Sequence, residues 1–232
     1  MSIAKDNLID LFEVSSSKRK AAEATRLRAG ELSRRERIAG VRSLGTARTV
    51  PKGELVFKEG EKAEFFYKVV SGVVRTYTIL DDGRRIIDDF HFAGDILGVD
   101  PGLAYRFSAM SVCDSALMTY RRSDLDEIVD SDSELRRDIV SSLVVSAGRA
   151  QDHLLLLGRR TARERILAFL SGMSQRVSRS KTSNLHMQRS DIADFLGLSR
   201  ETVSRTLTQL ESDGIVEVKH SRQVSVKADW IP

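Results

Sequence analysis

The sequence is poor in cysteine. Cys113 is the only cysteine among 232 residues, so no disulfide can form within the chain and no cysteine cluster can hold zinc or an iron–sulfur centre. The N-terminus lacks the long apolar run of a signal peptide, and no segment has the apolar length that crosses a bilayer. We therefore expect a cytoplasmic protein without membrane contact.

Histidine is scarce as well, and the sequence lacks the patterns of a catalytic or metal site. No Ser/His/Asp set, phosphate loop or pair of histidines stands out, so we expect no enzyme, no catalytic residue, no metal and no cofactor. Two alternatives stay open, a haem ligand at His91 or His153 and a redox role for Cys113, which otherwise reads as a small apolar residue. The four histidines fall in separate segments, at His91, His153, His186 and His220.

Composition permits several partners without selecting one. A hydrophobic fraction of 41% and a charged fraction of 30% describe a globular protein, and the net charge of +4 permits a nucleic-acid partner without proving one. The length allows one large domain or two smaller ones. The order of patterns along the chain favours two.

Residues 1–49 form a basic extension. A partly ordered tail followed by a short charged helix is expected here, because helical spacing of apolar residues is loose. The basic residues could contact DNA phosphates, but a solvated or dimer-contacting arm is favoured. They include Lys18, Arg19, Lys20, Arg26, Arg28, Arg34, Arg35 and Arg37.

Residues 50–122 show short β-branched and aromatic runs separated by glycine. This rhythm predicts antiparallel strands joined by tight turns, and Asp82-Gly83 is a strong hairpin signal. The predicted architecture is an antiparallel roll or sandwich. The expected strands are 55–57, 65–70, 73–79, 85–90, 96–99 and 116–120.

Residues 123–158 change to a helical period. Apolar residues at alternating steps of three and four predict the seam of a dimerisation helix. The alternative is an amphipathic helix buried in its own monomer, and the all-apolar run 154–157 shows that part of it must be covered from within. The predicted dimer interface is Val140, Leu143, Ala147, Ala150, Leu154 and Leu157.

The stretch Arg189–Thr208 reads as two short helices joined by a tight turn. Ala193 allows close helix approach, Gly197 supplies a left-handed turn, and Val203 returns an apolar side chain to the same small core. Ser199 is placed to cap the second helix. These positions predict a DNA-reading helix-turn-helix, and the alternative is an ordinary helical hairpin with a charged surface.

Residues 159–232 surround this motif with further signals. Thr161 and Glu164 form a capping box that begins a helix, and runs at 215–219 and 223–227 alternate like two strands of a wing. The motif is therefore expected to be a winged helix-turn-helix. The candidates for DNA backbone contact are Arg189, Ser199, Lys219 and Arg222.

Three runs of the roll carry a family resemblance: PKGELVFKEG, FFYKVVSGVVRTY and DDGRRIIDDFHFAGDILG. Together with the helix-turn-helix they resemble the CRP/FNR superfamily of bacterial transcription regulators, from about Val50 to Val226. The resemblance implies an α+β fold: an N-terminal antiparallel β-roll of the cyclic-nucleotide-binding type, a long dimerisation helix, and a C-terminal winged helix-turn-helix.

The resemblance also implies how DNA is read. Glu201, Ser204 and Arg205 match the base-reading positions of the FNR and FixK branches, whose half-sites resemble TTGA, and Arg200 matches the CRP branch. Glutamate can accept from cytosine and arginine can donate to guanine. The expected partners are double-stranded DNA with a palindromic promoter site, a second copy of the chain, and RNA polymerase, which makes the protein a homodimeric activator.

The resemblance bears on control by small molecules too. Where nucleotide-binding members carry a Gly-Glu pair and an Arg-Ser pair, this chain reads Leu97–Asp100 and Phe107-Ser108. Arg106 lies one residue away and is expected to point to the other face of a strand. Residues 1–50 contain no cysteine, which excludes the cysteine-cluster oxygen sensing of FNR. An effector-free FixK-type regulator is favoured, and a haem-, nucleotide- or redox-gated sensor is the alternative.

Overall fold

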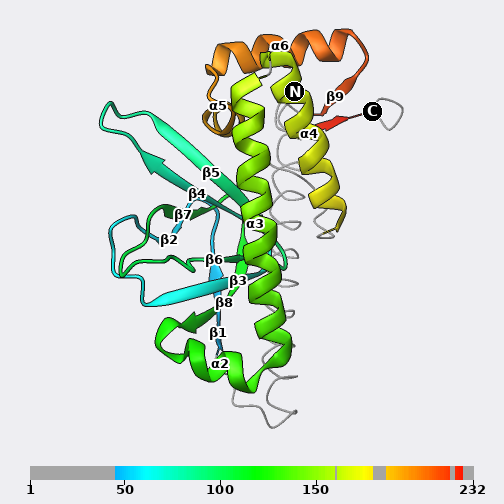
Figure 1. The fold of residues 1–232 in the computed structure, drawn as a ribbon. Helices are drawn as coiled ribbons and strands as arrows, with labels where there is room; N and C mark the ends of the chain where they lie inside the picture. The colour runs from blue at the N-terminus through cyan, green and yellow to red at the C-terminus, as the bar shows by residue number, and fades with distance from the viewer. Residues whose placement is uncertain (1–44, 160, 180–186, 220–222, 227–232) are drawn as a thin grey trace, which may run out of the picture.

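The computed structural model describes residues 45–159, 161–179, 187–219 and 223–226 (Figure 1). A β-roll, one long helix and a small helical unit with two strands follow one another along the chain. The predicted N-terminal helix, His186, His220 and Arg222 lie outside the described residues. No described helix combines the length and apolarity needed to cross a membrane.

The roll consists of two four-stranded sheets. All strand pairs are antiparallel, as the glycine-punctuated runs predicted. The first sheet has the order β1 (Gly45–Val50), β8 (Ser115–Arg121), β3 (Phe65–Ser71) and β6 (Ile96–Leu97). The second has the order β2 (Leu55–Phe57), β7 (Ser108–Ser111), β4 (Val73–Ile79) and β5 (Arg85–Phe92).

Glycine is required where β3 turns into β4. Gly72 has a φ of +88°, and a Cβ built on it would lie 2.7 Å from the Cα of Ser115. A side chain here would be strained by the backbone conformation and would collide with the neighbouring strand. The close approach of β8 to this turn therefore depends on the absence of a side chain at Gly72.

Strand β1 was not predicted from the sequence. It pairs with β8 from Gly45 opposite Tyr120 to Val50 opposite Ser115, so residues 45–49 belong to the sheet although they were assigned to the N-terminal extension. Only Val50 of this strand is buried. The strand therefore has no alternation of apolar and polar residues that could have revealed it.

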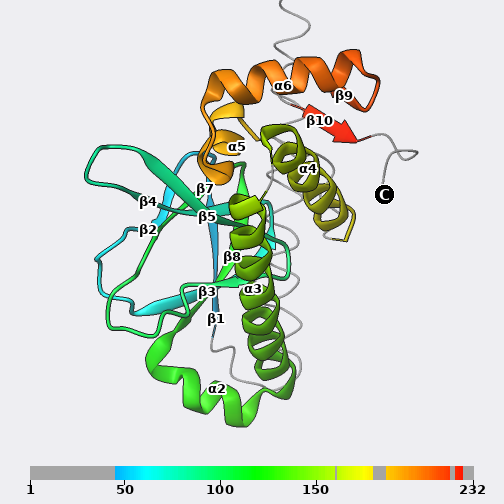
Figure 2. The same cartoon turned by 45° about the horizontal axis from the view of Figure 1, so that its top comes forward.

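A long helix connects the two ends of the molecule. After a 3-10 turn (Arg122–Asp124) and α2 (Leu125–Ser131), α3 (Ser133–Arg159) runs along the roll to the helical unit (Figures 1 and 2). On its inner side, Asp138 pairs with Lys68 at 2.6 Å, and the Ser142 hydroxyl accepts from the Ile96 N–H at 3.0 Å. The predicted helical region is confirmed, and α3 is fastened to the first sheet.

The described residues of the C-terminal unit form three helices and a two-stranded wing. The predicted capping box begins α4, because the Glu164 carboxylate accepts from the Thr161 N–H at 2.8 Å and the Thr161 hydroxyl accepts from the Glu164 N–H at 3.3 Å. The elements are α4 (Ala162–Arg179), α5 (Arg189–Leu196), α6 (Arg200–Ser212), β9 (Val216–Lys219) and β10 (Gln223–Val226).

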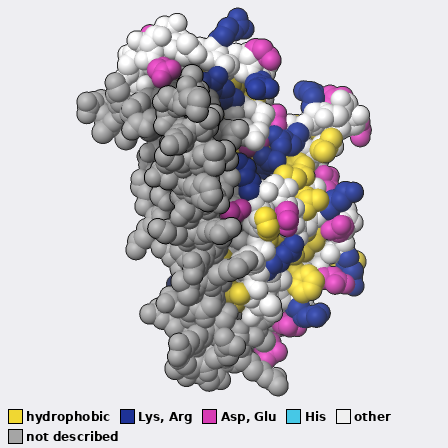
Figure 3. All heavy atoms as spheres, turned by 180° about the vertical axis from the view of Figure 1, so that it is seen from behind, with side chains coloured by type: hydrophobic (Ala, Val, Ile, Leu, Met, Phe, Trp, Pro, Cys, Tyr) yellow, Lys and Arg dark blue, Asp and Glu magenta, His cyan; other side chains and the backbone are white. Residues whose placement is uncertain are grey.

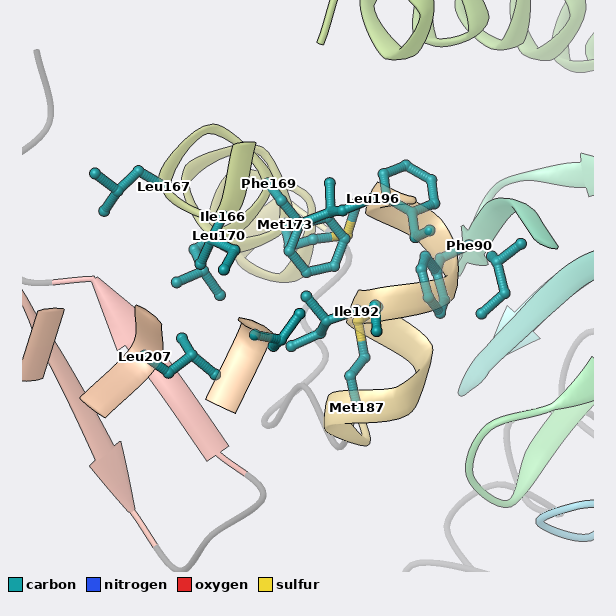
Figure 4. Packing of buried hydrophobic residues seen from close by; sticks show 14 of the residues in the cluster. Phe90, Ile166, Leu167, Phe169, Leu170, Met173, Met187, Ile192, Leu196 and Leu207 are labelled. Atoms are coloured by element: carbon teal, nitrogen blue, oxygen red, sulfur yellow. The ribbon is translucent and has the colours of Figure 1, made fainter. Parts of the chain in front are cut away.

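The roll and the C-terminal unit share one hydrophobic core. Phe90 of β5 lies 5.6 Å from Phe195 of α5 and 6.2 Å from Phe169 of α4, measured between ring centroids. Figure 4 shows Phe90 facing Leu196 and the helices of the C-terminal unit. Burial of these apolar side chains stabilises the docking of the unit on the β4–β5 hairpin.

Ion pairs fix the direction of this docking. Asp191 of α5 has a side chain that is 2% exposed, and its Oδ1 accepts from Arg75 Nη1 and Arg85 Nη2, each at 2.6 Å. Arg85 Nε also donates to Asp194 Oδ2 at 2.7 Å. Burial lowers the pKa of Arg75, while the Asp191 charge opposes this shift. We call these four residues the docking cluster.

A second set of ion pairs joins α3 and α4 to the roll. Arg149 contacts Asp89 at 2.9 Å and Asp95 at 3.2 Å, and Arg176 contacts the same two carboxylates at 3.1 Å and 2.9 Å. Burial alone would raise the pKa of Asp95, but Arg149 and the Phe92 N–H outweigh it and hold that pKa below its usual value. Both helices are therefore tied to the end of β5.

Removing the charge of Asp191 tests the docking cluster. Asp191→Asn leaves two arginines with incomplete compensation at a buried site, so the free energy of unfolding should fall by about 3 kcal/mol in urea denaturation. Asp82→Asn is the matched control, because Asp82 pairs with Arg84 at the exposed hairpin turn. The control should leave stability unchanged. Equal stability of the two variants would contradict a structural role for the cluster.

Candidate nucleic-acid interface

The turn between α5 and α6 has the geometry that the sequence predicted. Gly197 adopts the left-handed conformation with a φ of +61°, and its N–H donates to the Ala193 carbonyl. The Ser199 hydroxyl accepts from the Thr202 N–H at 3.1 Å and so caps α6. Ala193 and Val203 are buried between the two helices. The helix-turn-helix is thus held by a small core and two specific caps.

The N-terminal half of α6 presents polar side chains on one side. Val203 and Leu207 are buried, whereas Arg200, Glu201 and Arg205 are exposed and Ser204 is half-buried. This division follows from the 3.6-residue period of the helix. All four residues predicted to contact bases therefore lie on α6, and three of them are accessible to a ligand.

The charge of Glu201 is stabilised locally. Its carboxylate accepts from its own backbone N–H and from the Ser199 hydroxyl, which lowers the pKa of Glu201, and Arg200 and Arg205 add to this effect. A carboxylate in the first turn of a helix also interacts favourably with the helix dipole. Glu201 is therefore an ionised acceptor, as contact with a cytosine amino group requires.

The structure places two of the four candidates for DNA backbone contact beside this surface. Ser199 caps α6, and Arg189, the first residue of α5, donates from Nη1 to the Ser204 hydroxyl oxygen at 2.7 Å. Lys219 ends β9, but its side chain lies outside the described part of the structure, as does Arg222. Figure 3 shows Lys, Arg, Asp and Glu side chains mixed at this end of the molecule.

The docking cluster was missed by sequence analysis. Asp191 lies four residues before Phe195, which places the two on one face of α5, and both are buried. The spacing could have indicated an inward-facing carboxylate. It could not have identified Arg75 or Arg85, which lie more than a hundred residues earlier in the chain.

The predicted dimer interface is partly exposed in the single chain. Val140, Leu143 and Leu154 expose 56%, 48% and 71% of their surfaces, and Ala147 and Ala150 are exposed as well. Leu157 is half-buried and lies under the turn at Gly197. Three further exposed apolar residues of α3 were missed, Val144 at 67%, Val145 at 48% and Leu155 at 57%, because steps of three and four fit more than one stripe of residues along a helix.

A cavity of about 240 Å³ lies in the roll, where α3 crosses it. Phe107 and Arg106 both line it, so the expectation that Arg106 points to the opposite face is wrong. The reason is that β7 begins only at Ser108, and the alternation of a strand does not extend to residues 106 and 107. The Arg106 guanidinium lies 5.6 Å from the centroid of the Phe107 ring.

Neither described histidine belongs to a metal cluster. Within the described residues no group of three or more His, Cys, Asp or Glu side chains could hold a metal ion. His91 Nε2 lies 3.1 Å from the Thr76 hydroxyl, and burial lowers the pKa of His91. His153 Nε2 donates to the Phe195 carbonyl at 2.7 Å, and its ring stacks on that of Phe195. His153 thus connects α3 to α5.

Cys113 is half-buried near the end of the roll. Burial raises the pKa of its thiol, although the Val73 N–H and the Ser115 hydroxyl oppose this shift. A raised pKa reduces the thiolate fraction, and the thiolate is the reactive form. The environment therefore favours the packing role, and a redox role for Cys113 stays a prediction.

Two known domain families match the chain. The Crp-like helix-turn-helix domain matches residues 164–228, and the cyclic nucleotide-binding domain matches residues 47–132. The first range includes the whole surface described above on α5 and α6. The second includes strands β2 to β8, most of β1, and the part of the cavity wall that the roll contributes, Arg106 included.

Relatives over most of the chain are transcription regulators. The nitrogen fixation regulation protein FixK of Azorhizobium caulinodans is 43% identical over 81% of this chain and 77% of the relative. The transcriptional activatory protein AadR of Rhodopseudomonas palustris is 40% identical over 71% of each chain. The solved structure of FixK2 from Bradyrhizobium japonicum has a TM-score of 0.71 at 39% identity, covering 79% of this chain and 92% of that one. The predicted fold class is confirmed.

Substitutions at Ser199 separate capping from DNA contact. Ser199→Ala removes the cap of α6 and should lower the free energy of unfolding by about 1 kcal/mol. Ser199→Asp keeps a capping oxygen, so its stability should remain near that of the wild type, while its added negative charge should weaken binding to every duplex. Thermal unfolding and fluorescence anisotropy measure the two effects. Unchanged DNA affinity of Ser199→Asp would remove Ser199 from the phosphate contacts.

Proposed function

The chain belongs to the CRP/FNR family of transcription regulators, and from this premise we propose that two copies bind a palindromic DNA site of the TTGA type and activate transcription without a small-molecule effector. Like its relatives, it is a DNA-binding regulator and not an enzyme. The palindrome, the dimer, RNA polymerase as a partner, a cytoplasmic location and the absence of an effector are parts of the proposal.

The observation that carries the DNA reading is the exposed polar side of α6. Arg205 can donate bidentately to guanine, and the ionised Glu201 can accept from cytosine. Arg200 and Ser204 complete the base-contacting surface, and Arg189, Ser199, Lys219 and Arg222 contact phosphates. Because the cap and the turn fix α6, its N-terminal half can enter a major groove without reorganisation.

Pairing of two α3 helices supports the palindrome. The exposed apolar side chains of α3 would leave water on association, and they continue toward an open groove of about 610 Å³ between α3 and α4, lined by Leu154 and Leu155. A symmetric dimer places its two reading helices on half-sites about one helical turn of DNA apart. We further infer that residues 50–122 act as the roll, 123–158 as the dimerisation region and 159–232 as the DNA-binding domain.

The roll cavity supports independence from an effector. Cavities that enclose ligands typically measure about 300–1,000 Å³, whereas this one measures about 240 Å³ and contains Phe107 in its wall. Residues 1–50 contain no cysteine, which removes the ligands of an N-terminal iron–sulfur cluster. Activity is then set by the amount of the protein.

A ligand-gated regulator is the second candidate. It is favoured by Arg106, which lines the same cavity, and by His91, whose buried Nδ1 has no hydrogen-bond partner among the described residues. A ligand that binds only the folded state must raise the unfolding temperature. Cyclic nucleotide or haem is added at a concentration of about a hundred times a micromolar Kd, and we expect no change in the unfolding temperature. A rise in the unfolding temperature that Arg106→Ala abolishes would favour this second candidate.

Selection of DNA sites tests the proposed function as a whole. Ligand-free, full-length protein is incubated with a random duplex library, and the bound sequences are determined. A palindromic TTGA-type consensus is the expected result. If the protein selects random sequences in the absence of ligand and a consensus only when a ligand is added, the ligand-gated regulator replaces the effector-free one.

Substitution of Arg205 tests the reading of a base. On a selected palindrome, Arg205→Ala should lower affinity by roughly tenfold per half-site, since a bidentate contact to guanine is lost. On random duplex the same substitution should have a small effect. Both affinities are measured by anisotropy at one salt concentration, because phosphate binding depends on salt. An equal loss on both duplexes would make Arg205 a phosphate contact.

A further inference from the structure

We infer that Arg189 is a positioning residue that fixes the Ser204 hydroxyl as a hydrogen-bond donor, so that Ser204 selects thymine over cytosine at one position of each half-site. The inference rests on the proposed binding of DNA by α6. It adds a second role for Arg189 to phosphate contact, and it gives Ser204 a defined chemical preference.

The geometry assigns the acceptor in the contact between the two residues. Arg189 Nη1 lies 2.7 Å from Ser204 Oγ, between the first residue of α5 and the second turn of α6. A guanidinium carries donors only, so the hydroxyl oxygen must accept this bond. The O–H proton of Ser204 is not used in it.

Two other hydroxyls of α6 donate to a backbone carbonyl of their own helix, whereas the Ser204 hydroxyl donates to no carbonyl among the described residues. Thr208 donates its proton to the Ser204 carbonyl at 3.1 Å, and Ser212 donates to the Thr208 carbonyl at 3.0 Å. Such bonds to the carbonyl four residues earlier are common for hydroxyls in helices. In the described part of the chain, Ser204 Oγ forms no hydrogen bond other than the one from Arg189. Its proton is thus available to a ligand.

A hydroxyl in this state discriminates between the two pyrimidines. Thymine presents the O4 acceptor in the major groove, whereas cytosine presents the N4 amino donor. A serine without a partner could rotate and accept from cytosine. Here a cation already donates to Ser204 Oγ, and bringing a second donor to that oxygen is electrostatically unfavourable. Ser204 should therefore favour thymine.

The test compares pyrimidines that differ in the group at position 4, which is O4 in thymine and an amino group in cytosine. Full-length protein is titrated with its selected palindrome, which carries thymine, 5-methylcytosine or uracil at the position where Ser204→Ala loses preference. 5-Methylcytosine keeps the methyl group of thymine but exchanges O4 for an amino group, and uracil keeps O4 without the methyl group. Wild-type protein should favour thymine over 5-methylcytosine by about fivefold per half-site, as one hydrogen bond implies, and should bind uracil nearly as well as thymine.

Variants at Arg189 separate positioning from phosphate contact. Arg189→Met should weaken binding to all duplexes and also abolish the preference for thymine, and adding Ser204→Ala should cause no further loss of preference. Arg189→Gln can donate or accept, so it should relax the preference while keeping a polar partner. Arg163→Met is the matched control, because Arg163 pairs with Asp213 just beyond the other end of α6 at 2.7 Å. It should retain the preference.

Two results would overturn the inference. If Arg189→Met or Arg189→Gln weakens binding to the thymine and 5-methylcytosine sites equally, Arg189 contacts phosphate only. If Ser204→Ala keeps every base preference of the wild type, Ser204 does not read a base. Both results leave the proposed binding of a palindromic site intact, although the second removes Ser204 from the proposed base contacts. Wild-type protein that binds random duplex as tightly as any palindrome would instead overturn the proposed function, and the inference with it.

Discussion

A buried carboxylate determines how the two halves of this protein are joined. Burial of an ionised aspartate is unfavourable unless cations and hydrogen bonds compensate it. Asp191 meets this requirement only where α5 lies against the β4–β5 hairpin, because both compensating arginines belong to that hairpin. Apolar burial around Phe90 supplies attraction without direction. The ion pairs restrict the docked C-terminal unit to one orientation, and they thereby orient α6, which packs directly on α5.

Helix α3 secures the same orientation from a second side. Its His153 ring stacks on Phe195 with centroids 4.0 Å apart and donates to the carbonyl of that residue. Arg165 of α4 donates to the carbonyl of Leu157 in the last turn of α3 and to that of Leu196, the last residue of α5. The DNA-reading helix therefore keeps a constant position relative to the exposed apolar side of α3. If α3 pairs as proposed, the separation of the two reading helices follows from contacts within each chain.

Much of this arrangement could be predicted because its signals are local. Glycines at tight turns, a serine before α6, the Thr161–Glu164 capping box and the helical period of α3 each act within a few residues, and the structure contains all of them. Strand β1 could not be predicted, because four of its six residues are exposed and alternation is absent. Arg106 was misplaced by applying strand alternation to a loop. The docking cluster joins distant residues, and a single sequence contains no sign of such pairing.

The contacts of Asp191 have a consequence for synthesis of the chain. Its partners Arg75 and Arg85 precede it by 116 and 106 residues. At elongation rates of about 5–20 residues per second, the hairpin is synthesised roughly 5–23 s before α5. The roll can fold within this interval, with two arginines still in water. Association of the helix-turn-helix then completes folding as the last step, so a nascent chain that stalls before residue 191 presents a folded roll with no capacity to recognise DNA.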